Sequence, residues 1–228
     1  HYLLLMAEGG SDYNHAVTAL TAKSLWGPYV PCTINPVLTH RHLGKDYPVQ
    51  SLGHADLVQT PTGDWYAVFL GKRIVEGGLV PLGRETFLCE VSFQNGEPIF
   101  NPGIGVIGNR LKRPLLPWTP VSKTDKQNDF ESSALSPEWA TMRIPEQPLH
   151  HFADGNLFLS LRPEMADSLV CPSMLLLRVH SHNFSATTTM SFSTRRANEW
   201  AGLALYRTAK GYYSLLKGKN EIRLTIDK

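Results

Sequence analysis

Short apolar runs divided by glycine and proline constrain the fold of this chain more than any other feature of its sequence. The 228 residues include 18 Gly and 16 Pro, and 42% of the chain is hydrophobic. The run from Tyr2 to Ala7 is too short for a typical helix and is typical of a fully buried strand. None of the apolar runs approaches the length that spans a bilayer. The pattern therefore predicts an all-β chain with a sizeable core.

Two turn signals in the sequence predict two β-hairpins. In Thr60-Pro61-Thr62-Gly63, proline restricts φ and glycine frees it, which favours a tight connection between strands. Asn95-Gly96 is the strongest short hairpin signal in the sequence, because both residues accept the positive φ that such a turn needs. The four strands predicted on either side of these turns are 56–59, 64–70, 87–93 and 98–101.

Charge and cysteine content exclude several classes of function. With 22 basic and 20 acidic residues the net charge is +2, which makes no electrostatic case for nucleic acid or a membrane surface as a partner. The three cysteines lack the paired spacing of a zinc site and are predicted to be buried apolar residues. A basic run at 40–42 has no partner spacing and is predicted to be a solvated loop. The cysteines are Cys32, Cys89 and Cys171.

Glu8 is the first candidate for chemistry. It follows the first apolar strand and precedes Gly9 and Gly10, which allow the backbone to turn sharply and a ligand to approach closely. A carboxylic acid at the end of such a strand is a candidate proton donor. The alternative is a solvated loop glutamate, which is common in loops.

Glu8 lies in the first of several longer motifs, which follow one another along the chain. The segment from Ala7 to Thr18 is Ala-Glu-Gly-Gly-Ser-Asp-Tyr-Asn-His-Ala-Val-Thr, and Ala-Lys-Ser-Leu-Trp-Gly-Pro-Tyr follows at 22–29. Downstream, in order, come Gly-His-Ala-Asp-Leu-Val at 53–58, Gly-Asp-Trp-Tyr at 63–66 and Pro-Leu-Gly-Arg-Glu-Thr-Phe at 81–87. This order of motifs resembles glycoside hydrolase family 43 over roughly residues 1 to 110. A weaker resemblance, to the β-sandwich of the family's β-xylosidases, begins at about Leu135.

The resemblance implies a five-bladed β-propeller followed by a concanavalin A-like β-sandwich. At roughly 40 to 50 residues per blade, residues 1–110 supply little more than two blades, so the propeller is expected to be partial. Residues 111–134 are rich in proline and charge and are predicted to be a linker. Residues 135–228 are predicted to form an incomplete sandwich. Its predicted strands are 157–161, 174–179, 186–192, 202–206, 212–217 and 221–226.

The resemblance also implies chemistry. Family 43 enzymes invert configuration, which requires one acid to protonate the leaving oxygen and a second carboxylate to activate water. Glu8 matches the general acid, for which an apolar, water-poor setting is expected. No segment matches the general base or the carboxylate that tunes the acid, so both are expected to be missing from this chain. Asp56 is expected to cap backbone amides instead, and Asp12 is too near Glu8 in sequence to act across a sugar from it.

Three further residues are candidates for substrate binding. Arg84 matches an arginine that hydrogen-bonds sugar hydroxyls, the alternative being an ion pair with Glu85 or another acid. His54 matches a histidine that organises the pocket floor, sometimes through water or a calcium ion. His15 is a weaker candidate for the leaving-group side, with hydrogen bonding inside its own loop as the alternative. No organic cofactor is implied.

The resulting hypothesis is an inverting hydrolase of xylosidic or arabinofuranosidic bonds in plant cell-wall polysaccharides. Its expected partners are xylo-oligosaccharides or arabinose-substituted substrates, with neither nucleic acid nor membrane. The alternative is a truncated, inactive remnant that binds sugar. The sequon at Asn183 suits a secreted protein, although so short a motif also arises by chance.

Overall fold

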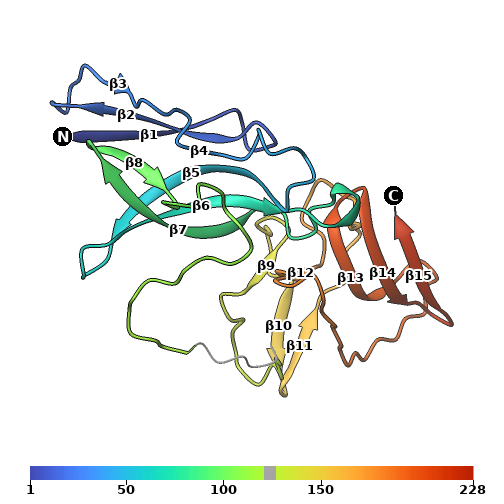
Figure 1. The fold of residues 1–228 in the computed structure, drawn as a ribbon. Helices are drawn as coiled ribbons and strands as arrows, with labels where there is room; N and C mark the ends of the chain where they lie inside the picture. Colours follow the sequence, from blue (N-terminus) through green and yellow to red (C-terminus); the bar gives the residue numbers. More distant parts are fainter. Residues whose placement is uncertain (121–126, 228) are drawn as a thin grey trace. The chain divides into compact units, whose positions relative to one another are not determined.

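The computed structural model describes residues 1–120 and 127–227, and in them the regular structure is almost entirely β. One short 3-10 turn, η1 (Glu76–Gly78), interrupts the strands. The described residues form two compact units, one on each side of the segment 121–126 (Figure 1). No helix in the described part of the chain could cross a membrane. The prediction of an all-β chain is confirmed.

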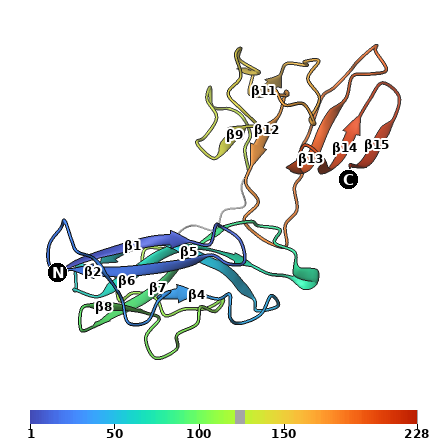
Figure 2. The same ribbon diagram turned by 90° about the horizontal axis from the view of Figure 1, so that it is seen from above.

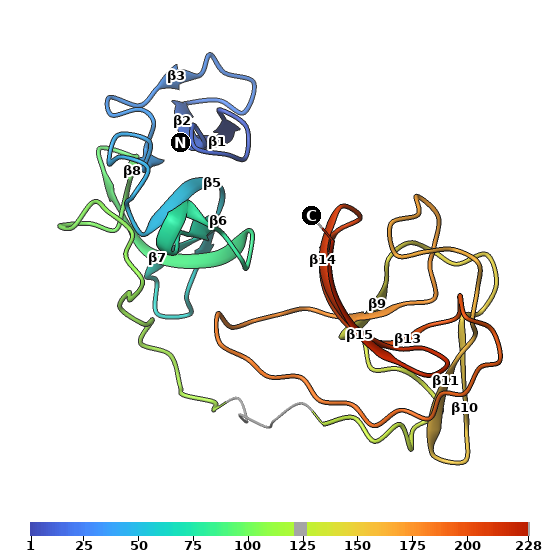
Figure 3. The ribbon, with the colours of Figure 1, turned by 90° about the vertical axis from the view of Figure 1, so that its right-hand side faces the viewer.

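The larger sheet of the first unit is an antiparallel meander of four strands, β5-β6-β7-β8. Both predicted hairpins are present, although β5 and β6 extend beyond the predicted ends. Asn95 (φ 54°) and Gly96 (φ 83°) make the tight turn between β7 and β8. Figure 3 looks nearly along these strands and shows their strong twist. The strands are β5 (Val49–Gln59), β6 (Trp65–Arg73), β7 (Glu85–Gln94) and β8 (Glu97–Phe100).

The second sheet of this unit is centred on β2. One edge of β2 pairs with β1, and the other pairs with the two short strands β3 and β4. Figure 2 shows β1 lying alongside β5 of the larger sheet, and the two strands are in contact. The strands are β1 (Tyr2–Glu8), β2 (Ala16–Ala22), β3 (Val30–Pro31) and β4 (Leu38–Thr39).

The strand at Tyr2 to Ala7 is confirmed, but the expectation that it is fully buried is wrong. Tyr2, Leu4 and Met6 are 44%, 39% and 42% exposed, whereas Leu5 packs against the core. Alternate side chains of a strand point to opposite faces, so an unbroken apolar run does not require both faces to be covered. Among the described residues, β1 pairs only with β2, and its inner face, with Leu3 and Leu5, is partly buried.

The core of the first unit lies between its two sheets. Val17 and Leu38 come from the smaller sheet, and Leu52, Ala67 and Phe69 come from the larger one. Other buried members are Cys89, Val91, Phe100 and Ile107. The prediction that Cys32 and Cys89 are buried is confirmed, whereas Cys171 in the second unit is only partly buried.

The prediction that the basic run at 40–42 is a solvated loop is wrong for His40, whereas Arg41 is partly exposed and His42 is exposed. His40 is 1% exposed, and its Nδ1 lies 2.6 Å from the carbonyl oxygen of Val49. Its Nε2 accepts a hydrogen bond of 3.0 Å from the backbone N–H of Ile107. Both ring nitrogens are therefore engaged with backbone from distant parts of the sequence, which no local pattern of charge could indicate.

The second unit contains three small antiparallel sheets, β12-β9, β10-β11 and β13-β14-β15. Five of the six strands predicted there overlap an observed strand. The prediction for 186–192 is wrong, because that segment is irregular and almost all of its side chains are exposed. The strands are β9 (Trp139–Thr141), β10 (His150–Ala153), β11 (Asn156–Leu159), β12 (Leu175–Leu177), β13 (Ala201–Thr208), β14 (Gly211–Lys217) and β15 (Ile222–Asp227).

One face of the curved sheet β13-β14-β15 (Figure 3) is apolar and exposed. Leu203, Leu215 and Leu224 lie side by side across the three strands, as their pairing requires. They are 37%, 52% and 70% exposed, and the next row of the same face is exposed as well. That row is Leu205, Tyr213 and Ile226.

Candidate functional site

Glu8 is the last residue of β1, and the chain turns immediately after it. Gly9 and Gly10 have φ values of 72° and 67°. A Cβ atom on Gly9 would lie 2.1 Å from the carbonyl oxygen of Asn14, so only glycine fits where the loop closes on itself. The loop rejoins the sheet through His15, which begins the return into β2.

The Glu8 carboxylate is paired and half-exposed. Its Oε1 lies 3.3 Å from Nη1 of Arg41, and the two side chains are 42% and 38% exposed. This setting differs from the apolar, water-poor one expected from the sequence. The strand alternation places Glu8 on the same face of β1 as Leu4 and Met6, which is the exposed face.

A small cavity of about 190 Å³ opens beside this pair. Its polar side chains are those of Glu8, Arg41, Thr18 and Asn35, and Pro36 completes the lining. Thr18 pairs with Met6 across the β1–β2 ladder, so its side chain shares the face that carries Glu8. The buried Thr18 hydroxyl makes no hydrogen bond within the described part of the chain. The cavity thus brings a carboxylate, a guanidinium and an unpartnered hydroxyl together.

His15 is buried between the two sheets. Its side chain is 3% exposed, and Nδ1 lies 3.0 Å from the carbonyl oxygen of Ser51 in β5. The imidazole covers Gly53, where an added Cβ atom would lie 2.4 Å from Nε2. The ring contact thus reaches the neighbouring sheet, while the backbone N–H of His15 donates a hydrogen bond of 2.9 Å to the carbonyl oxygen of Asp12 inside its own loop.

His54 stands at an irregular point of β5. The pairing with β6 shifts register on both sides of Gly53, and Ser51 and His54 have φ values of 59° and 56°. Positive φ in a residue other than glycine is strained, and such strain is concentrated at functional sites. The His54 side chain is exposed. Among the described residues, no three His, Cys, Asp or Glu side chains form a metal-binding group, for calcium near His54 or elsewhere.

Arg84 is exposed and directly precedes β7. The adjacent acid, Glu85, is held by Arg73 through a forked contact, with Nη2 to Oε2 at 2.6 Å and Nε to Oε1 at 2.9 Å. Hydrogen bonding to Glu85 raises the pKa of Arg73. Glu85 is thus engaged by an arginine on the neighbouring strand β6.

Cross-strand contacts bring these candidates to one end of the first unit. Gly53 pairs with Leu70, and Gly71 pairs with Glu85, so the bend of β5, the end of β6 and the start of β7 are neighbours. The loop after Glu8 joins them through an ion pair of 3.1 Å between Asp12 and Lys72. Lys72 lowers the pKa of the Asp12 carboxyl, mainly through this hydrogen bond.

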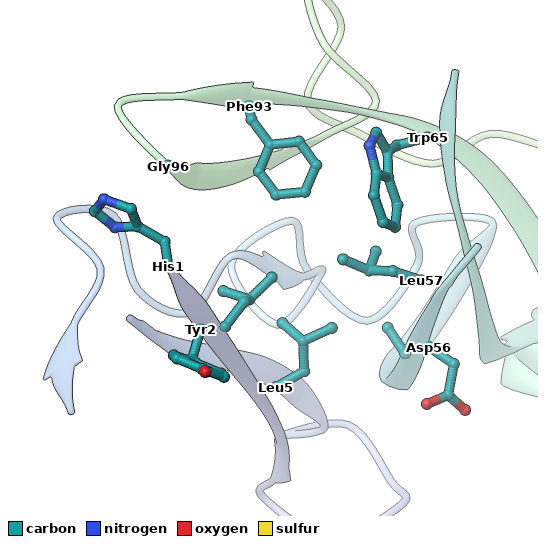
Figure 4. A pocket seen from close by; sticks show the side chains of 10 residues that line it. His1, Tyr2, Leu5, Asp56, Leu57, Trp65, Phe93 and Gly96 are labelled. Carbon is teal, nitrogen blue, oxygen red and sulfur yellow. The ribbon is translucent and has the colours of Figure 1, made fainter. Parts of the chain in front are cut away.

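A larger groove of about 550 Å³ lies elsewhere in the unit, and the predicted site residues do not line it. Trp65, Phe93 and Leu57 form its apolar wall, with Leu5 of β1 opposite them (Figure 4). Asp56 lies at its edge (Figure 4) and is exposed, with no hydrogen bond to its carboxylate among the described residues. The expectation that Asp56 caps backbone amides is therefore wrong. We place the candidate site at Glu8 rather than here, because titratable groups converge there.

Sequence reasoning missed Arg41 and Lys72. Each reaches the Glu8 loop from far away, since Arg41 lies 33 positions after Glu8 and Lys72 lies 60 positions after Asp12. Arg41 belongs to the run at 40–42, which was predicted to be a solvated loop, and Lys72 belongs to no motif that the sequence analysis used. The flanking positions offered only a weak signal, since Lys72 and Arg73 end an apolar strand.

Comparison with known proteins decides the relationship that the motifs suggest. Residues 1–98 match the family model described as glycosyl hydrolases family 43. Residues 127–226 match the model described as the β-xylosidase C-terminal concanavalin A-like domain. The chain belongs to glycosyl hydrolase family 43. The prediction of a propeller part followed by a concanavalin A-like sandwich is confirmed at the level of these two families.

Two family 43 relatives and one solved structure give the extent of the similarity. A xylosidase/arabinosidase from Butyrivibrio fibrisolvens is 35% identical over 98% of this chain and 44% of its own length. The non-reducing end α-L-arabinofuranosidase BoGH43B from Bacteroides ovatus is 35% identical over 95% of this chain and 41% of its own length. The solved structure titled Bacteroides ovatus xyloglucan PUL GH43B has a TM-score of 0.84 and 32% identity, covering 99% of this chain and 45% of the other.

This family 43 chain thus spans less than half the length of the relatives that it matches. Their printed names include both xylosidase and arabinofuranosidase activities.

Proposed function

We propose that the protein containing these residues is an inverting glycoside hydrolase that cleaves xylosidic or arabinofuranosidic bonds of plant cell-wall polysaccharides. Glu8 acts as the general acid. The general base is supplied by none of the residues of this chain. Its substrates are xylo-oligosaccharides or arabinose-substituted polymers, as the names of the relatives suggest.

The observation that carries the proposal is the position of Glu8 at the end of β1. Its carboxylate opens on a polar cavity and is reachable from solvent, while the backbone beside it turns away through two glycines. A general acid must come within hydrogen-bond reach of the oxygen that it protonates, and this placement allows a glycosidic oxygen to approach.

In the proposed reaction, Glu8 donates its proton to the leaving oxygen as the glycosidic bond breaks. A second carboxylate removes a proton from water on the opposite face of the sugar, and the water attacks the anomeric carbon. In inverting enzymes the two carboxyl groups stand about 6.5 to 9.5 Å apart to leave room for that water. Asp12 lies in the same short loop as Glu8 and is engaged by Lys72, which argues against it as the second group.

The proposed substrate-binding residues are Arg84 and His54, which contact the sugar, and His15, which supports the pocket without contacting it. Exposed Arg84 presents a planar fork of donors that suits vicinal hydroxyls. His54 supplies an exposed imidazole beside the bend of β5. Buried His15 acts through Gly53, whose backbone it covers, so its proposed part is to shape the pocket wall.

The alternative, a sugar-binding remnant without hydrolysis, is favoured by the lack of a matched second carboxylate. Hydrolysis of an aryl β-xyloside distinguishes the hydrolase from the remnant when two proteins are compared. These are the isolated 228-residue chain and the full-length natural protein. We expect negligible turnover by the isolated chain and clear turnover by the full-length protein. Inactivity of both, with retained sugar binding, would support the remnant.

The decisive substitution is Glu8→Gln in the full-length protein, with Glu131→Gln as a matched control on an exposed segment. Loss of general acid catalysis typically costs about 10²- to 10⁴-fold, so kcat on xylobiose should fall by that order. An aryl glycoside with an acidic phenol needs less protonation and should lose far less. An unchanged rate on xylobiose would remove Glu8 from the role of acid.

A further inference from the structure

We propose that Arg41 is a positioning residue for Glu8, holding its carboxylate at the end of β1 and stabilising the negative charge that Glu8 acquires as it releases its proton. This inference rests on the proposed function, because it assigns Arg41 a part in the proton transfer by Glu8. Arg41 belongs to the run at 40–42. Unlike a solvated basic residue, it pairs with Glu8 and its backbone is hydrogen-bonded on both sides.

Glu8 needs an external restraint. The two glycines after it adopt positive φ and carry no side chain that could pack against the carboxylate. With 42% of its side chain exposed, Glu8 has little surrounding packing to select one rotamer. Within the described part of the chain, the contact with Arg41 at 3.3 Å is the hydrogen bond that its carboxylate makes. A general acid that is free to swing loses the alignment on which proton transfer depends.

Arg41 is well placed to supply that restraint, because its backbone is anchored on both sides. Its N–H donates to Oγ1 of Thr39 at 3.3 Å, and its carbonyl accepts a hydrogen bond of 2.5 Å from the hydroxyl of Tyr13. Tyr13 belongs to the loop that follows Glu8, so this loop and Arg41 are joined by two separate contacts. The preceding residue, His40, is buried and bonded through both ring nitrogens.

The charge of Arg41 has the sign that the reaction needs. As Glu8 gives its proton to the leaving oxygen, the O–H bond breaks and its electron pair remains on the carboxylate. A guanidinium already in place stabilises this charge without reorganisation, which is how preorganised donors lower a barrier. The pair is half-exposed, so water weakens the effect relative to a buried donor.

The test compares Arg41→Met with wild type in the full-length protein, on xylobiose and on an aryl β-xyloside with an acidic phenol. We expect kcat on xylobiose to fall by about 5- to 30-fold, below the 10²- to 10³-fold typical of a buried donor, while KM changes by less than about twofold. The loss should shrink on the aryl substrate, as for Glu8→Gln. Arg41→Lys keeps the charge and should recover part of kcat.

The controls separate positioning from folding. His42→Ala changes an exposed neighbour and should leave kcat unchanged. In a Glu8→Gln background, Arg41→Met should cause no further loss, because the group on which it acts is gone. Should Arg41→Met fail to fold, Arg41→Lys is compared with Arg41→Gln. Lysine keeps the positive charge, and glutamine lacks it.

A full loss in Glu8→Gln with an unchanged rate in Arg41→Met overturns the role of Arg41 and leaves Glu8 as the acid. Equal losses from Arg41→Met with and without the Glu8 carboxylate also overturn it. An unchanged rate in Glu8→Gln refutes the acid assignment, and the proposal for Arg41 falls with it.

Discussion

The backbone N–H of Ile107 donates a hydrogen bond to Nε2 of His40 across 67 residues of sequence. Nδ1 of the same ring lies 2.6 Å from the carbonyl oxygen of Val49, so His40 must be neutral with its proton on Nδ1. This arrangement ties the segment after β8 to β5 through one buried imidazole.

The first unit should therefore be less stable at acidic pH. Burial lowers the pKa of His40, and the nearby His42 lowers it further, against the opposing bond to Val49. The unfolded chain then takes up a proton below about pH 6.5 while the folded chain does not, so stability falls as the pH drops below that value. Urea denaturation of wild type and His40→Gln between pH 5 and 8 measures the effect. His42→Ala removes the smaller contribution and should keep most of the pH dependence, because burial is the main cause of the lowered pKa of His40. A wild-type midpoint independent of pH would contradict the prediction.

Replacing His40 by alanine should lower the free energy of unfolding more than protonating its ring does. His40→Ala leaves the Ile107 N–H and the Val49 carbonyl without their partner and opens a cavity in the core, for which we expect about 2 to 4 kcal/mol of lost stability. The exposed His42→Ala should stay within about 0.5 kcal/mol of wild type. Thermal denaturation followed by circular dichroism compares the two, and equal losses would show that His40 is not the residue that ties the segment down.

Gly53 is expected to tolerate no side chain, because His15 covers it. In Gly53→Ala the new Cβ atom would lie 2.4 Å from His15 Nε2, and such overpacking costs about 1 to 3 kcal/mol. Gly108→Ala is a matched control, since its nearest neighbour would lie at 3.9 Å and its backbone has no positive φ. His15→Ala should relieve part of the strain in the double variant. A destabilisation that the second substitution leaves untouched would argue against the His15 contact.

The three thiols should differ in reactivity. Cys89 is buried, which raises its pKa to about 11, and burial also raises the pKa of Cys32. A thiol reacts through its thiolate, so both should react slowly with a disulfide reagent in the native protein at pH 8. Partly buried Cys171 should react first. Cys171→Ser should remove the fast phase, and a fast phase that persists in this variant would contradict the assignment.

Arg84 should act on substrate affinity more than on the chemical step. Arg84→Ala in the full-length protein removes a fork of donors, so we expect KM to rise by about tenfold or more while kcat changes less. Lysine is a poor replacement for a planar fork, so Arg84→Lys should recover little. Arg110→Ala changes another exposed arginine as the control. Unaltered KM in Arg84→Ala would exclude it from substrate binding.

The apolar face of β13-β14-β15 should make the isolated chain associate. A row of exposed leucines across three strands favours association with other apolar surfaces. A lysine in the middle of this row should therefore raise solubility. Sedimentation velocity of wild type and Leu215→Lys measures this, with Leu169→Lys, at a position 84% exposed in another segment, as the control. A wild-type chain that stays monomeric at high concentration would contradict the expectation.

Local patterns were sufficient for the strands and turns that depend on neighbouring residues. The Asn95-Gly96 hairpin and the turn at 60–63 could be predicted because their backbone geometry is set within four residues. The strand leading to Glu8, and the glycines after it, could be predicted for the same reason. The segment 186–192 was predicted as a strand and is not one, because a strand also needs a partner that its own sequence does not specify.

The sequence by itself determined the all-β class, the family motifs and the position of Glu8 at the end of its strand. Only the tertiary structure decided that His40 is buried, that Arg41 meets Glu8, that Asp56 lies at the edge of an apolar groove, and that one face of β1 stays exposed. The physical reason is that these features depend on contacts between segments 33 to 67 residues apart, or on which face of a strand is covered. Periodicity along the chain shows that a strand has two faces, and only packing shows which of them is buried.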